Sequence, residues 1–350
     1  MRYKMPFGNG NIIINISERA NCVEIQPKSI IPLKDPVESF INTLNHPIKA
    51  NSLRGMIQKK VTKEDKIVVV IDDQTRNFPF KIILPPFIEY VRDCGVQDSQ
   101  VCFLIACGAH KPPSKEHLNT MFGNLLKGFM LKISSSETAD YISLGTTSRN
   151  TPVLINQTYV GAAFRILLTD ITLHYFAGFG GDRKSILPGV AARSTIESNH
   201  KLLFKKGVGP GILDGNPVHE DMLEGAKFIG ADFVCNICLN DQNKIFHIAS
   251  GRLNEAFRTA VNKYKEIFSV RVTKQADLLL ISQGGYPYDI NYYQSQKALQ
   301  QCIKAVKPGG TIIYFTQSSE GIGNEVLEKN LRIFNTSDDI LKVLEQEFRQ

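Results

Sequence analysis

Short apolar segments rich in β-branched residues recur along the chain, separated by segments with helical periodicity. The apolar segments span residues 66–71, 101–106, 165–169, 233–239, 276–281 and 311–315. Continuously apolar strands are typical of sheets covered on both faces, and their alternation with helices, as at 253–268 and 294–306, predicts parallel pairing. The fold class is therefore predicted to be α/β: two α/β domains with mostly parallel sheets and an active-site cleft between them.

The length of the chain, 350 residues, is enough for two domains of ordinary size. The predicted helix at 253–268 is followed by a polar segment, and a new strand–helix–strand pattern begins at residue 276. We place the boundary near residue 270. This gives an N-terminal α/β domain of residues 1–270 and a smaller C-terminal α/β domain of residues 271–350.

The charge and cysteine content narrow the class of protein. The net charge is +7, but the Lys and Arg residues are scattered, so nucleic acid is not expected as a partner. A mild positive balance suits anionic small substrates. The seven cysteines are irregularly spaced, which favours a reducing compartment. With no signal-peptide pattern and no apolar run long enough to span a membrane, we expect a cytoplasmic protein without a membrane partner.

The strand predicted at 66–71 is followed by a carboxylate, a hydroxyl and a guanidinium, on Asp73, Thr75 and Arg76. Ligands of open α/β sheets bind beyond the carboxyl ends of the strands, so this loop is a candidate anion site. The alternative is an Asx-type turn with a surface arginine, because polar turns follow strands routinely.

His110 stands at the same place after the strand predicted at 101–106, behind Gly108. Its ordinary pKa lies near working pH, which makes it a candidate acid/base. The alternative is a histidine of a surface loop.

The densest group of candidate residues begins at His174 and runs through a glycine-rich loop with Gly180 and Gly181 to Lys184. A P-loop is excluded, because Arg183 stands where that motif needs glycine before the lysine. A glycine-rich loop with a lysine can still wrap a phosphate or present a reactive amine. His200 follows at the predicted end of a short helix, and imidazole suits nickel, zinc or copper.

Gln294 and Lys297 are three residues apart near the start of a predicted helix, so they share one face. Such a pair can hold a carboxylate, or it can be a solvated helix face.

In order and spacing, these segments resemble the nickel-dependent lactate racemase family, whose relatives act on other 2-hydroxyacids. The motifs that carry the resemblance are Asp73-x-Thr75-Arg76, Gly108-x-His110, the loop from His174 to Lys184 with Leu187-Pro-Gly, Asn199-His200, and Gln294-x-x-Lys297, together with segments 215–221 and 232–240.

The resemblance implies a nickel-pincer nucleotide, a pyridinium-3-thioamide-5-thiocarboxylic acid mononucleotide that clasps nickel. By this resemblance Lys184 would carry the cofactor covalently and His200 would be the protein ligand to nickel. The cofactor would also be bound by Asp73, Thr75, Gly180 and Gly181. His110 and His174 would be the catalytic acid/base pair, and the substrate carboxylate would be bound by Arg76, Gln294 and Lys297.

The function that the resemblance implies is racemisation or epimerisation at C2 of a 2-hydroxyacid, by hydride transfer through a 2-ketoacid. Cofactor-synthesis enzymes would be transient partners. The alternatives are a zinc or nickel hydrolase or lyase with His110, His174 and His200 as ligands, and a non-catalytic anion- or nucleotide-binding protein. Family members usually continue for several tens of residues past residue 350, so the C-terminal domain is expected to be compact or incomplete.

Overall fold

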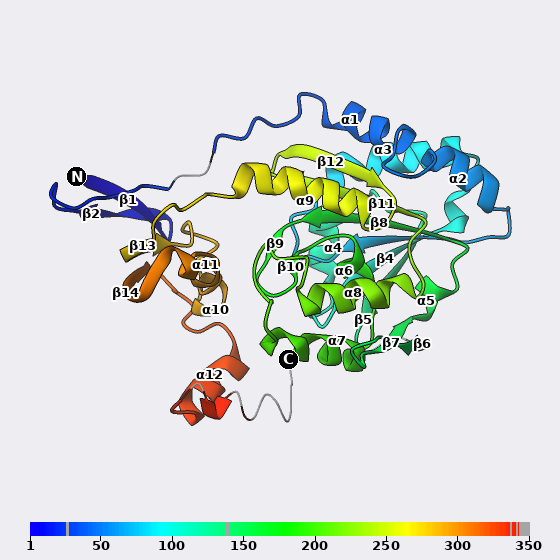
Figure 1. Ribbon diagram of the computed structural model, residues 1–350. Helices are drawn as coiled ribbons and strands as arrows, with labels where there is room; N and C mark the ends of the chain where they lie inside the picture. Colours follow the sequence, from blue (N-terminus) through cyan, green and yellow to red (C-terminus); the bar gives the residue numbers. More distant parts are fainter. Residues whose placement is uncertain (26–27, 138–139, 337, 341, 343–350) are drawn as a thin grey trace. The chain divides into compact units, whose positions relative to one another are not determined.

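The computed structural model describes residues 1–25, 28–137, 140–336, 338–340 and 342 (Figure 1). The chain divides into two compact units, which we describe separately. The core unit comprises residues 28–268, and the flanking unit is formed by the described residues before Lys28 and after Phe268. The second junction lies close to the boundary predicted near residue 270.

The placement of the N-terminal residues differs from the sequence-based division, which assigned them to the first domain. In the structure they group with the C-terminal residues. The N–H of Gly8 donates to the buried carboxylate of Asp289 at 2.8 Å, and the N–H of Tyr286 donates to the carbonyl of Gly8 at 2.8 Å. Each of these pairings joins residues more than 270 positions apart, so no local sequence pattern predicts them.

The core unit is built on a six-stranded sheet with the strand order β12-β11-β8-β3-β4-β5. All neighbours are parallel except β11 and β12, which are antiparallel. The strands are β3 (Ile67–Asp72), β4 (Val101–Gly108), β5 (Met130–Ser135), β8 (Phe164–Ile171), β11 (Phe233–Leu239) and β12 (Ile245–Gly251). The short pairs β6 (Tyr141–Thr146) with β7 (Pro152–Asn156) and β9 (Leu173–His174) with β10 (Gly178–Phe179) lie outside it.

Helices cover both faces of this sheet, as the continuously apolar strands require. Alternate residues of β3 point to opposite sides: Val69 belongs to one buried cluster with α1, α2 and α3, and Val70 to another with α6, α7 and α8. The helices of this unit are α1 (Pro36–Asn45), α2 (Leu53–Lys60), α3 (Phe80–Asp93), α4 (Lys115–Phe122), α5 (Gln157–Val160), α6 (Arg183–Ile186), α7 (Arg193–His200), α8 (Pro217–Lys227) and α9 (Glu255–Phe268). The α/β class and the mostly parallel sheet are confirmed.

The flanking unit combines an N-terminal hairpin with a small C-terminal α/β segment. Its strands are β1 (Arg2–Phe7) antiparallel to β2 (Gly10–Asn15), and β13 (Ala276–Ser282) parallel to β14 (Val306–Phe315). Its helices are α10 (Tyr292–Ser295), α11 (Lys297–Cys302) and α12 (Glu325–Ile333). The helix predicted at 294–306 is thus shorter and divided, because residue 306 already begins a strand. None of the helices in the described ranges combines the length and apolar character that a membrane crossing requires.

The strand order places a switch point beside β3. After β3 the chain continues to β4 and β5 on one side, and it later returns to β8 and β11 on the other. In open α/β sheets such a reversal leaves a crevice at the carboxyl ends of the strands, where ligands bind. The three loops of interest leave β3, β4 and β8 at this edge.

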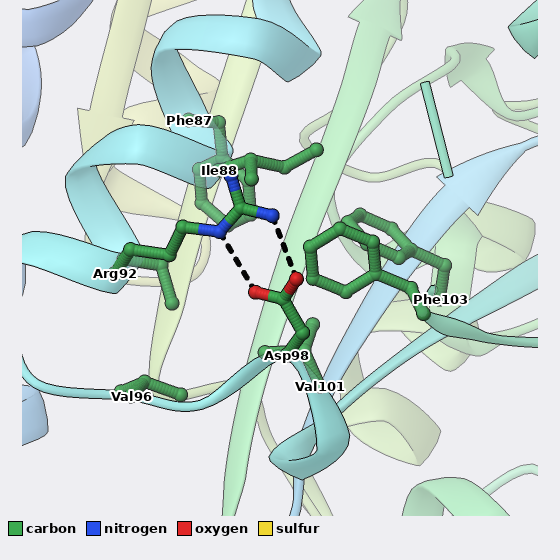
Figure 2. Close-up of a pocket in the computed structure, with 9 residues that line it drawn as sticks. Phe87, Ile88, Arg92, Val96, Asp98, Val101 and Phe103 are labelled. Atoms are coloured by element: carbon green, nitrogen blue, oxygen red, sulfur yellow. Dashed lines mark hydrogen bonds and ion pairs between the residues drawn. The ribbon is translucent and has the colours of Figure 1, made fainter. Parts of the chain in front are cut away.

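A small cavity and a larger groove lie toward the amino ends of the strands. A cavity of about 10 Å³ lies between α3 and β4, and the paired Arg92 and Asp98 side chains flank it (Figure 2). A groove of about 660 Å³ lies near the amino ends of β3, β4 and β5. Neither the cavity nor the groove includes a candidate site residue. The candidate residues lie at the opposite edge of the sheet, at the carboxyl ends of the strands.

Candidate active site

Asp73 connects the loops that follow β3 and β4. Its Oδ2 lies 2.7 Å from Nδ1 of His110, while its Oδ1 accepts the N–H of Thr75 at 2.9 Å and the Thr75 hydroxyl at 2.5 Å. Thr75 Oγ1 also lies 3.3 Å from Nδ1 of His110. The loop is thus an Asx turn that also holds a histidine, so the two interpretations of its sequence are compatible.

The Asp73 carboxylate sets the proton arrangement of His110. Burial raises the pKa of Asp73, but the hydrogen bonds and charge of His110 and the hydrogen bonds from Thr75 outweigh it and hold the pKa below its ordinary value of 3.8. An ionised carboxylate only accepts, so Nδ1 of His110 carries a proton, and Nε2 is the nitrogen left to exchange one with a ligand. With 46% of its side chain exposed, His110 offers that nitrogen as a base.

Asp73→Asn is expected to lower turnover by about 10²-fold or more, because the amide no longer fixes the His110 tautomer. The substitution should also reduce the loss of folding stability between neutral and acidic pH. A depressed pKa adds stability above the ordinary value of 3.8 that is lost as pH falls through the folded pKa. Denaturant midpoints at pH 7 and pH 3 measure this, and an unchanged difference between them in the variant would contradict it.

The His110 loop is tied by its backbone to the loop that carries Lys184. The N–H of Gly108 donates to the carbonyl of Gly189 at 2.9 Å. Gly108 has φ +53°, and a Cβ there would lie 3.1 Å from the Pro188 carbonyl oxygen. The glycine before His110 therefore permits a close approach between the loops, which brings two of the predicted motifs together.

Lys184 lies in α6, a single helical turn wedged between the sheet and α8, and it is only 9% exposed. Burial lowers its pKa well below 10.5, and the charges of Arg76 and Arg183 lower it further, while Asp72 and Asp170 act in the opposite direction. A lowered pKa makes the uncharged, nucleophilic form of a lysine amine easier to reach. The structure therefore gives Lys184 the chemistry of a reactive amine.

The Phe176 ring is the common neighbour of three candidate residues. Its centroid lies 4.5 Å from the His174 ring, 4.8 Å from the His200 ring and 5.9 Å from Nζ of Lys184. Both imidazoles meet it edge to face. His174, Lys184 and His200 therefore form one cluster around an apolar ring, and Arg76 belongs to the same electrostatic neighbourhood because its charge acts on His174 and Lys184.

His174 has the opposite hydrogen-bond arrangement to His110. Its Nδ1 accepts the backbone N–H of Ala177 at 3.2 Å. Burial lowers the pKa of His174 well below 6.5, and the positive charges of Lys184 and Arg76 lower it further. The neutral ring then carries its proton on Nε2.

His200 closes α7, as the sequence predicted, and it is buried. Its Nδ1 lies 2.6 Å from the carbonyl of Ile196, which can only accept, so Nδ1 donates and Nε2 keeps its lone pair. Burial lowers its pKa to about 4 although that hydrogen bond raises it. A neutral imidazole oriented through its other nitrogen is the usual state of a metal ligand.

A buried carboxylate that sequence reasoning missed holds the helix of His200. Asp221 accepts hydrogen bonds from Thr147, Thr151 and Asn199, the neighbour of His200, with Asn199 Nδ2 at 2.7 Å. It thereby joins α7 and α8 to the turn between β6 and β7. The family-like segment 215–221 was the signal that could have found it.

The two glycines predicted to bind the cofactor have a packing reason of their own. A Cβ on Gly180 would lie 2.7 Å from Oγ1 of Thr172, and one on Gly181, which has φ +89°, would lie 2.6 Å from Cδ1 of Ile171. Both glycines therefore allow the loop to lie close to the end of β8. Their contact with a cofactor stays a prediction.

Two acidic residues beside Lys184 were not singled out from the sequence. Asp72 ends β3 and Asp170 lies near the end of the neighbouring β8, where the N–H of Asp170 donates to Oδ2 of Asp72 at 3.1 Å. Burial and the charge of Asp170 raise the pKa of Asp72 well above 3.8, and burial also raises that of Asp170. Burial therefore disfavours the form of the pair in which both carboxyl groups are ionised.

Gln294 and Lys297 lie in the flanking unit and contact each other. Nζ of Lys297 donates to Oε1 of Gln294 at 2.7 Å, across the step from α10 to α11. The two side chains thus lie next to each other, as expected for residues on one face; their contact with a substrate stays a prediction.

No group of three or more His, Cys, Asp or Glu side chains in the described part of the chain is arranged to hold a metal ion. His110, His174 and His200 are therefore not gathered as a three-histidine site.

Family models match both parts of the chain: "lactate racemase N-terminal domain" over residues 7–209 and "lactate racemase C-terminal domain" over residues 271–350. Lactate racemase of Thermoanaerobacterium thermosaccharolyticum is 32% identical over 286 residues, 81% of this chain. That of Lactiplantibacillus plantarum is 29% identical over 299 residues, 84% of this chain. The chain spans 66% and 69% of the length of these relatives.

Solved structures give the same relationship. The lactate racemase apoprotein from Thermoanaerobacterium thermosaccharolyticum superposes with a TM-score of 0.88 and 27% identity, covering 99% of this chain and 82% of the other. A protein from Thermotoga maritima, with a TM-score of 0.67 and 15% identity over 90% of this chain and 80% of its own, shares the fold alone. The resemblance found in the sequence is thus confirmed, and this chain belongs to the lactate racemase family.

Proposed function

We propose that this protein is a racemase or epimerase that inverts C2 of a 2-hydroxyacid by hydride transfer, with a nickel-pincer nucleotide as cofactor. The observation that carries the proposal is the cluster around Phe176, where a buried amine of lowered pKa, Lys184, lies with His174 and His200. Family membership supports the reaction class, since relatives that match most of this chain are named lactate racemase.

The residues of the cluster fit this cofactor. Lys184 offers an amine of lowered pKa that could form the thioamide link, and His200 would offer Nε2 to nickel while Nδ1 is held by the Ile196 carbonyl. One histidine would be enough, because the nucleotide would supply the other donors to nickel. When bound, the group supplies a reversible hydride acceptor. Cofactor-synthesis enzymes are accordingly proposed as transient partners.

The two remaining histidines provide the proton transfers. His110, whose Nδ1 is held by Asp73, would accept through Nε2 the hydroxyl proton of a 2-hydroxyacid as C2 gives up hydride and the substrate becomes a planar 2-ketoacid. After the ketoacid has turned, His174 would give its oxygen a proton as hydride returns to C2, entering that step as the imidazolium and leaving it as the neutral imidazole. In the reverse reaction the two histidines would exchange these roles.

The substrate carboxylate would be held by arginine and by the pair in the flanking unit. Arg76 follows the Asp73 turn, where its N–H donates to the carbonyl of Asp73 at 3.1 Å. A guanidinium can bind a carboxylate through two parallel hydrogen bonds. By the family resemblance, Gln294 and Lys297 are also proposed as substrate ligands, since an amide and an ammonium each suit a carboxylate.

The test follows the fate of the C2 hydrogen. The holoprotein, produced together with cofactor-synthesis enzymes, is given a panel of single-enantiomer 2-hydroxyacids in D₂O. We expect inversion of at least one acid with no solvent deuterium at C2, because hydride leaves and returns without exchange. Incorporation of solvent deuterium at C2 would indicate proton abstraction instead, and inversion of none of the acids would contradict the proposed function.

A further inference from the structure

Arg183, the residue before Lys184, is the largest fully buried side chain in the described part of the chain. A guanidinium withdrawn from water needs acceptors for its N–H groups. Nη1 donates to the carbonyl of Gly181 at 3.1 Å, and Nη2 donates to those of Ala177 at 2.9 Å and Phe179 at 2.8 Å. The guanidinium carbon lies 4.3 Å from the Phe257 ring centroid. Arg183 therefore gathers three carbonyls of the segment between His174 and Lys184.

Two of these carbonyl groups belong to residues that also contact the candidate catalytic and cofactor residues. The N–H of Ala177 donates to Nδ1 of His174 at 3.2 Å, and the carbonyl of the same residue, in the next peptide group, accepts from Arg183. The carbonyl of Gly181 accepts both Nη1 of Arg183 and the N–H of Lys184, the latter at 3.1 Å. One side chain thus joins the residue that bonds to His174 to the peptide that begins the Lys184 turn.

The turn itself is held from a second side by Asp182. This buried residue has φ +51°, a backbone conformation that favours glycine, so its side chain must have a reason to be there. Its carboxylate accepts the N–H of Arg183 at 2.7 Å and the N–H of Asn254 at 3.2 Å. Its own N–H donates to Oγ1 of Thr169 at 3.1 Å. These hydrogen bonds hold the backbone at Arg183, and so they set the point from which its side chain extends.

We propose that Arg183 is a positioning residue that fixes Lys184 and His174 relative to each other before cofactor or substrate binds. The roles of those two residues rest on the proposed function, whereas the positioning itself does not. Charge alone does not meet this requirement, because the contacts use two separate nitrogens of a planar fork. Lysine at this position keeps the charge but loses the fork.

The test compares Arg183→Lys with Arg165→Lys. Arg165 is a matched control at the amino end of β8: its Nε and Nη2 donate to the carbonyls of Tyr159 at 2.9 Å and Val160 at 2.7 Å, and its guanidinium lies 5.8 Å from the Tyr159 ring centroid. Three readouts are taken: amide hydrogen exchange of residues 177–186 and the ¹⁵N signal of His174 Nδ1, both in the apoprotein, and the fraction of Lys184 peptide carrying the cofactor adduct.

For Arg183→Lys we expect about tenfold faster exchange in this segment, a changed His174 Nδ1 signal and about tenfold less adduct, as the loss of charged hydrogen bonds implies. Arg165→Lys should leave all three at wild-type values. Wild-type exchange and His174 signal in folded Arg183→Lys would overturn the proposal.

Two further outcomes are distinguishable. Absence of adduct in the wild type would contradict the proposed function, while the two apoprotein readouts would still decide the positioning role. If Arg183→Lys does not fold, Phe257→Leu removes the ring beneath the guanidinium and keeps the arginine. Its exchange and His174 signal should shift in the same direction by less, and wild-type values there would overturn the proposal.

Discussion

Lys184→Ala is expected to abolish cofactor attachment and racemisation together, with a loss on the order of 10⁶-fold or more, the scale of a whole enzymatic rate enhancement. The reason is that this amine is the one proposed covalent link to the group that accepts hydride. The side chain is buried and its pKa is lowered well below 10.5, mainly by burial, which favours the uncharged form that a covalent link requires. Intact mass and racemisation are measured on the same preparation.

Two further variants make this prediction specific. Lys184→Met keeps the apolar stem in its buried place, so it should fold at least as well as the alanine variant and be equally inactive. Lys227→Ala, which removes an exposed lysine in the last turn of α8, should keep both adduct and activity. Activity near the wild-type level in either Lys184 variant would remove the cofactor assignment.

His110→Ala and His174→Ala are each expected to lower racemisation by about 10²- to 10⁴-fold, the range of a positioned acid or base. Nickel should stay bound in both variants, since the proposed protein ligand is His200. The two variants should differ in detail: His110 works with the Asp73 carboxylate, whereas His174 is held by the Ala177 N–H. Turnover in both directions and nickel content per chain measure these effects.

His117→Ala is the matched control for the histidine variants. This histidine caps the start of α4 together with Ser114, so its loss should affect local stability and leave turnover unchanged. Loss of nickel in His110→Ala or His174→Ala would show that residue to be a metal ligand, and wild-type turnover in either would exclude it as acid or base.

Much of the candidate site could be predicted from the sequence because parallel strands bring their carboxyl ends to one edge. The loops after β3, β4 and β8 follow apolar segments that are easily recognised, and Asp73, His110 and His174 stand within three residues of the strand ends. The contact between Asp73 and His110 then follows from the pairing of β3 with β4. What the sequence could not supply is the strand order that makes these three strands neighbours.

The residues that sequence reasoning missed act through contacts that have no local pattern. From the sequence, Arg183 served only to exclude a P-loop, because it replaces the glycine that this motif requires. In the structure its guanidinium donates hydrogen bonds to three carbonyls of the preceding loop. Asp221 looks like any polar residue on an amphipathic helix, yet it is fully buried and accepts from two threonines and an asparagine. The N-terminal hairpin joins the C-terminal residues by pairings across the whole chain length.

The most direct test of the cofactor assignment is the mass of the Lys184 peptide from protein produced together with cofactor-synthesis enzymes, read with the nickel content of the same sample. We predict a mononucleotide-sized adduct on that peptide and about one nickel per chain, since each chain offers one His200 to the metal. Metal without an adduct would point to direct ligation by histidines, and neither metal nor adduct to a binding protein. Either result would contradict the proposed function.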